Sequence, residues 1–198
     1  MKRHVVALCL GCTSAVVVFA VGISRIPKAP EKHEPLTLTP PSALILPLRQ
    51  PPATFPPGTY QPNKRESEAS GPIDLGDFSA GRDLTYIEDD RVWWESDNDT
   101  NDVECDHTVH NAMRTPFERV IELVAERGGT LKVQDTYRPD RIHNDRSLHK
   151  EGRAIDLTCN EMSLEELAKL CWQAGFDWVY NEKGSRSNGP HVHASVAR

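Results

Sequence analysis

Apolar residues recur at helical spacing in two segments of this chain. The first covers residues 115–127 and opens on Thr115-Pro116-Phe117-Glu118, a capping box with proline at the first helical position. Gly128-Gly129 ends it, because glycine suits the position just after the last helical turn. The second segment opens on the capping box Ser163-Leu164-Glu165-Glu166 and ends at Gly175. We therefore predict two amphipathic helices.

Shorter segments between and after these helices alternate apolar with polar residues, which predicts strands with one buried face. One strand surrounds Asp156 in the run Ala154-Ile155-Asp156-Leu157-Thr158, and the others cover residues 131–136, 177–181 and 191–196. We expect an α+β domain, in which the helices pack on one face of a mixed or antiparallel sheet.

The N-terminal segment has the composition of an export signal. Lys2-Arg3-His4 precedes a stretch without charged residues from Val5 to Ile23. That length is close to the ~20 residues with which a helix crosses a bilayer. We assign residues 1–26 to a signal peptide or membrane anchor, and cleavage, retention and lipidation at Cys12 all stay open. The protein is then expected in the periplasm or cell envelope, attached to the membrane if the segment is retained.

A proline-rich segment follows. Residues 27–72 hold 12 of the 15 prolines and show hardly any apolar periodicity. This composition predicts an extended, disordered linker. The folded domain is therefore expected at residues 73–198, an ordinary length for one domain, and we expect it to be a monomer.

Charge divides at the same boundary. Residues 1–72 carry 8 Lys and Arg against 4 Asp and Glu, which leaves 15 against 25 and a formal charge of −10 for residues 73–198. An acidic surface repels polyanions, so we expect no nucleic-acid partner. The domain has three cysteines, Cys105, Cys159 and Cys171, which leaves open one disulfide with one free thiol.

Two separated motifs contain the residue types that zinc prefers. His149 and Asp156 lie seven residues apart, and His193 ends the motif His191-Val192-His193. Two histidines and one carboxylate, with water as the fourth ligand, suit a catalytic zinc site. Gly152 allows a tight turn between His149 and the Asp156 strand. On a strand, His191 and His193 share one face, so one can bind metal while the other faces a ligand.

These motifs resemble a known family. The run SLHKEGRAID at 147–156, the run AGFDWVY at 174–180 and the terminal HVHASV resemble the N-terminal signalling domain of Hedgehog proteins, from about Leu84 to Val196. The frame HxxGxAxD plus HxH is also similar to that of the D-Ala-D-Ala metallopeptidases (peptidase M15), which share the fold. The resemblance implies zinc ligation by His149, Asp156 and His193.

The same resemblance implies roles for other residues. Glu182 matches the carboxylate that holds the metal-bound water in Hedgehog domains, and His143 matches a histidine beside the metal or substrate. Glu182 is followed by a longer polar loop, residues 183–190, than Hedgehog domains carry. Calcium binding is implied for Asp89, Asp90, Asp135 and Asp140, with a solvated acidic loop as the alternative.

Arg138 departs from the Hedgehog pattern, because Hedgehog domains place a calcium-binding acid there. Its context Tyr137-Arg138 is similar to the peptidase pattern, whose arginine binds the terminal carboxylate of the substrate. The alternative is a loop residue that makes a surface ion pair.

The first interpretation is therefore an exported zinc metallopeptidase that hydrolyses peptides, with peptidoglycan stem peptides as substrates. Glu182 would act as the base, Arg138 would hold the substrate carboxylate, and His191 or His143 would support the oxyanion. The alternative is a zinc-binding and calcium-binding Hedgehog-like signalling or binding module without peptidase activity, because a shared fold does not determine function.

Overall fold

The computed structural model describes residues 47–95, 106–139, 144–185 and 188–198. In this part of the chain, six strands form a mixed sheet of order β1-β7-β8-β6-β5-β3, and two others form an antiparallel pair, β2-β4. The strands are β1 (Tyr60–Gln61), β2 (Leu84–Tyr86), β3 (Val92–Trp94), β4 (Thr108–His110), β5 (Leu131–Asp135), β6 (Ala154–Cys159), β7 (Trp178–Glu182) and β8 (His191–Ser195).

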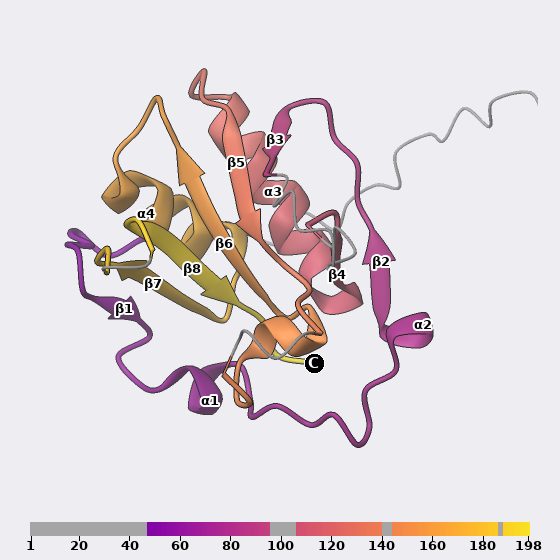
Figure 1. Ribbon diagram of the computed structural model, residues 1–198. Helices are drawn as coiled ribbons and strands as arrows, with labels where there is room; N and C mark the ends of the chain where they lie inside the picture. The colour runs from indigo at the N-terminus through magenta and orange to yellow at the C-terminus, as the bar shows by residue number, and fades with distance from the viewer. Residues whose placement is uncertain (1–46, 96–105, 140–143, 186–187) are drawn as a thin grey trace, which may run out of the picture. The chain divides into compact units, whose positions relative to one another are not determined.

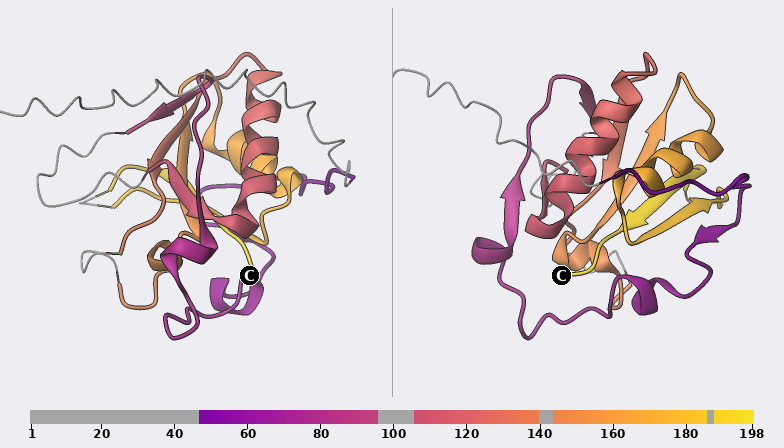
Figure 2. Two further views of the ribbon diagram at one scale, coloured as in Figure 1. Left: turned by 90° about the vertical axis from the view of Figure 1, so that its right-hand side faces the viewer. Right: turned by 180° about the vertical axis from the view of Figure 1, so that it is seen from behind.

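Two longer helices cover one face of the six-stranded sheet, as Figures 1 and 2 show. The helices are α1 (Glu66–Ala69), α2 (Ala80–Asp83), α3 (Arg114–Ala125) and α4 (Leu164–Ala174), with two 3₁₀ helices, η1 (Asn111–Met113) and η2 (Leu148–Glu151). The α+β architecture predicted from the sequence is confirmed. Among the described residues, no helix has the length and apolar character needed to span a bilayer.

The alternation along β6 and β8 decides which side chains face the helices. Leu157 and Val192 are fully buried in the core, together with Ala194. Asp156 and His193 lie opposite each other in the register of β6 and β8 and point to the other face. The sheet therefore separates a packed apolar layer from a face that carries polar side chains.

The two predicted helices differ in how well their starts were predicted. Ser163 caps α4 as expected, because its hydroxyl accepts a hydrogen bond from the Glu166 amide, and Gly175 follows the last turn at φ +111°. The predicted capping box at Thr115 does not form. Helix α3 begins at Arg114 without a side-chain cap, since η1 runs directly into it and Asn111 accepts from the Arg114 amide.

The linker boundary expected at residue 72 also differs in the structure. Residues 47–72 belong to the same compact unit as the rest of the described chain. Phe55 is buried, and β1 forms an edge strand that pairs with β7. Side-chain donors of the domain bind backbone carbonyls of the segment: Trp172 binds Gln50, Lys169 binds Ala53, Asn181 binds Phe55 and Trp178 binds Lys64.

These contacts use carbonyl oxygens, which proline also possesses, so the segment packs without apolar periodicity. The first part of the predicted linker and residues 1–26 lie outside the described residues.

Candidate metal centre

His149, Asp156 and His193 meet on the polar face of the sheet. One ligand atom from each residue lies within 4.8 Å of the others, and no other group of His, Cys, Asp and Glu in the described segments meets this criterion. His149 Nε2 lies 3.5 Å from Asp156 Oδ2. Tetrahedral zinc keeps neighbouring ligand atoms about 3.4 Å apart, so the donor set and spacing of this metal-ligand triad fit the ion.

A tight turn positions His149. The residue lies in η2, and Gly152 ends that helix in the left-handed conformation at φ +64°. A Cβ at Gly152 would approach the Leu84 side chain to 2.8 Å and the His110 amide nitrogen to 3.0 Å, so only glycine fits. His149 Nδ1 donates to the Thr136 carbonyl over 2.7 Å, which leaves Nε2 to face Asp156.

His193 uses its nitrogens in the opposite sense. Its Nδ1 donates to Asp156 Oδ1 at 2.7 Å, and its Nε2 donates to Glu66 Oε1 at 2.8 Å. Metal would therefore replace the proton on Nδ1, while Glu66 keeps the ring oriented from behind. Glu66 was not identified as a site residue from the sequence, because it lies on α1 within the segment expected to be a linker.

The electrostatics of the centre favour charged groups in the absence of metal. Burial alone would lower the pKa of His193, but the attraction of Asp156 and the hydrogen bonds to Asp156 and Glu66 raise that pKa well above its ordinary value. Burial would raise the pKa of Asp156, yet His149 and His193 hold it well below its usual range. The ionised Asp156 carboxylate therefore favours a positive charge next to it, either a protonated histidine or a metal ion.

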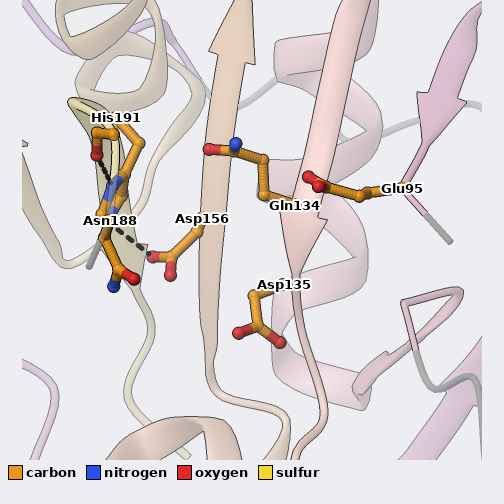
Figure 3. Close-up of a pocket in the computed structure, with 7 residues that line it drawn as sticks. Glu95, Gln134, Asp135, Asp156, Asn188 and His191 are labelled. Atoms are coloured by element: carbon orange, nitrogen blue, oxygen red, sulfur yellow. Dashed lines mark hydrogen bonds and ion pairs between the residues drawn. The ribbon is translucent and has the colours of Figure 1, made fainter. Parts of the chain in front are cut away.

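His191 lies next to the triad, as expected for a histidine two positions before His193. Its Nε2 is 3.5 Å from Asp156 Oδ1 and also 3.5 Å from Glu182 Oε2. Figure 3 shows His191 and Asp156 on one side of a cavity of about 270 Å³ that also adjoins β5. Glu182 ends β7 and reaches the triad through His191, and His143 lies outside the described residues.

Arg138 does not occupy the expected position of a substrate clamp. The residue is only 5% exposed, and its guanidinium donates to Asp135 and, at 3.4 Å, to Asp106. The buried Asp106 and the partly buried Asp135 occupy the guanidinium donors that would have bound a substrate carboxylate. Arg138 is thus part of an internal ion-pair network, and neither a clamp nor a surface ion pair describes it.

The predicted calcium acids are not brought together among the described residues. Asp89 accepts hydrogen bonds from the Arg91 backbone and guanidinium, and Asp135 accepts from Arg138. Asp90 is not part of any metal-binding group in the described chain, and Asp140 lies outside it. Each arginine supplies the positive charge that calcium would otherwise bring.

Comparison with known families identifies the domain. Residues 62–195, about two thirds of the chain, match the Hedgehog amino-terminal signalling domain. The chain belongs to this family. The match includes the whole metal-ligand triad and also Glu66, so the Hedgehog domain begins before the boundary expected at residue 73.

Individual Hedgehog proteins are similar over a shorter stretch. The chain is 44% identical over 72 residues to Indian hedgehog B protein of Danio rerio, which covers 35% of this chain and 16% of that protein. Identity is 39% to Sonic hedgehog protein of Danio rerio, with the same coverage, and 36% to Protein hedgehog of Drosophila hydei, with 14% of that protein covered. The matched part spans about one sixth of these relatives.

This family assignment corrects the enzymatic interpretation. The family is one of signalling domains and the similar proteins are named Hedgehog, so a zinc metallopeptidase that hydrolyses peptidoglycan is the wrong expectation. Glu182, Arg138, His191 and His143 were expected to act in that reaction, and the pairing of Arg138 with Asp135 and Asp106 agrees with the correction. The alternative interpretation, a signalling or binding module, agrees better with the family.

Proposed function

We propose that this Hedgehog domain holds one zinc ion through His149, Asp156 and His193 and docks a partner protein on the sheet face around that ion. The main support for this proposal is that the three ligand atoms converge on the face of the sheet that the helices leave uncovered. Bound zinc would supply a fixed positive charge and cross-link η2, β6 and β8.

The hydrogen-bond acceptors behind His149 and His193 support zinc as the bound ion. Thr136 and Glu66 accept from the ring nitrogens that point away from the triad, which fixes the orientation of both rings. Such partners typically strengthen metal binding 10–100-fold. The acids at 89, 90 and 135 offer no comparable arrangement, so the proposal is limited to zinc.

The family and the surroundings of the triad support docking rather than catalysis. Similar proteins carry the name Hedgehog and the family is described as a signalling domain, a function that requires a partner. Arg138, the arginine expected to bind substrate, instead forms ion pairs with Asp135 and Asp106. The open face with its cavity then serves recognition of another protein.

A peptide-display selection tests this proposal. Random linear peptides are selected on the zinc-loaded full chain and tested against the chelated chain, a Tyr180→Ala variant and a Glu122→Ala variant. Tyr180 lies opposite His193 in the sheet, whereas Glu122 is exposed on α3. We expect the selected peptides to need zinc and Tyr180 but not Glu122. Peptides that bind all four proteins equally would contradict docking at this face.

A further inference from the structure

Five residues form a row across the sheet on the face of the metal centre. Neighbouring strands pair Tyr60 with Tyr180, Tyr180 with His193, His193 with Asp156, and Asp156 with Asp135. Directly opposed residues of adjacent strands point to the same face, so the row is continuous from β1 to β5. The metal-ligand triad occupies its middle, and the two ends differ in chemistry.

Aromatic rings occupy one end. Tyr60, Trp178 and Tyr180 have ring centroids 5.5 to 6.1 Å apart, and Trp178 lies 5.8 Å from the His193 ring. Tyr60 remains 39% exposed. Trp178 is buried and Tyr180 is partly buried, so this aromatic platform (Tyr60, Trp178, Tyr180) presents mainly the Tyr60 ring to a ligand beside the metal centre.

An acidic cavity occupies the other end. It is lined by Glu95, Gln134, Asp135, Asp156, Asn188, Gly189 and His191. An irregularity in β5 shifts the register between Val133 and Asp135, so that both Gln134 and Asp135 turn towards the cavity (Figure 3). Three carboxylates and no lysine or arginine line it; with Asp156 assigned to zinc and Asp135 paired with Arg138, Glu95 is the carboxylate that favours a cationic occupant.

Several polar groups of this cavity have no partner in the described chain. The Glu95 carboxylate makes no hydrogen bond or ion pair with the described residues, and neither do the side-chain amides of Gln134 and Asn188. Asp135 and Asp156, in contrast, are held by Arg138 and the histidines. Glu95 and the two amides are thus available to bind an ammonium or guanidinium group.

We propose, resting on the docking function above, that the partner contributes an extended segment with a lysine or arginine in the acidic cavity and a ring side chain on the aromatic platform. The cavity is lined from β5, β6 and β8, and three inter-strand steps, about 14 Å at the usual strand spacing, separate the middle one, β6, from Tyr60 on β1. An extended peptide covers about 13 Å between positions i and i+4, whose side chains point the same way. The basic and aromatic residues are therefore four positions apart.

Bead-bound peptides test this arrangement on the zinc-loaded full chain. The probe is Ac-Lys-Xaa-Xaa-Xaa-Tyr with mixed residues at Xaa, compared with versions that replace Lys by Glu, replace Tyr by Gly, or shorten the spacer by one residue. We expect each change to weaken binding about tenfold or more, because a charge-assisted contact or a stacked ring is lost.

Protein variants locate the contacts. Glu95→Lys should weaken the lysine peptide about tenfold and strengthen the glutamate peptide, whereas Glu88→Lys, the same charge change at an exposed acid, should alter neither. Tyr60→Ala should remove the preference for Tyr over Gly, and Tyr86→Ala, at another exposed tyrosine, should keep it.

Three outcomes would each overturn this inference: the peptides bind equally whatever their charge and spacing, the lysine peptide does not bind, or its affinity is unchanged by Glu95→Lys. Zinc-dependent binding of other peptides to Tyr180 would still support the proposed docking function. Zinc-independent binding would overturn the docking function itself, so the two failures are distinguishable.

Discussion

Glu66 accepts a hydrogen bond from Nε2 of His193 at 2.8 Å, although 127 residues separate the two in the sequence. The contact fixes the tautomer of His193, so that Nδ1 rather than Nε2 faces the metal position. It is also one of several contacts that hold part of the proline-rich segment on the domain. That segment contributes directly to the candidate metal centre.

Replacing Glu66 by Gln should weaken zinc binding 10–100-fold while the fold is retained, because a neutral amide orients His193 less strongly than a carboxylate. Competition with a chromophoric chelator measures the affinity. Glu68→Gln, an exposed acid on the same helix, serves as the matched control and should bind zinc like the parent. Equal affinities for both variants would show that Glu66 has no role in orienting His193.

The sequence predicted the strands and helices where the local pattern is decisive. Helix α4 was predicted closely because Ser163 and Gly175 carry their own capping chemistry, and the triad was found because His149 and Asp156 lie within one motif. Glu66 and the network of Arg138 escaped prediction. Their partners are distant in sequence, and a single carboxylate or guanidinium does not reveal which charge it will meet.

Gly152→Ala should destabilise the domain by about 2–4 kcal/mol, because an alanine there adopts an unfavourable positive φ and also clashes with Leu84 and His110. Gly128→Ala is the control, since Gly128 has φ +73° but open space around its Cβ position. That variant should lose only about 1–2 kcal/mol. Urea unfolding distinguishes the two, and equal losses would rule out the steric contribution at Gly152.

Arg153→Met should lower the free energy of unfolding by about 3–5 kcal/mol, since it leaves the buried Glu151 carboxylate with one cationic partner fewer. It also removes donors to the carbonyls of Ser70 and Pro72, which hold the segment carrying Glu66, and a donor to the Val196 carbonyl after β8. Thermal and urea denaturation test this. Arg82→Met, at an exposed ion pair, should leave the midpoint unchanged, and an equally small effect at Arg153 would contradict a stabilising role of the Arg153 contacts.

The stability of the metal-free protein and the increment that zinc adds to it should respond to pH in opposite ways. The folded-state pKa of His193 is raised, so its contribution to the metal-free protein is fully present below the unfolded-state value of about 6.5. That contribution is lost as pH rises through the folded-state pKa. Zinc needs Nδ1 deprotonated, so the stabilisation that zinc adds should grow over the same interval. Melting temperatures from pH 6 to 9, with and without zinc, test this, and a zinc increment independent of pH would exclude proton competition at His193.

Zinc content measured on purified protein after dialysis against metal-free buffer tests the metal centre most directly. We predict one zinc per chain in the parent and in His107→Ala, a histidine outside the triad. His149→Ala should retain less than about a tenth of that amount, because removing one ligand leaves an incomplete shell. A parent without zinc, or a His149→Ala protein with as much zinc as the parent, would contradict the proposed centre.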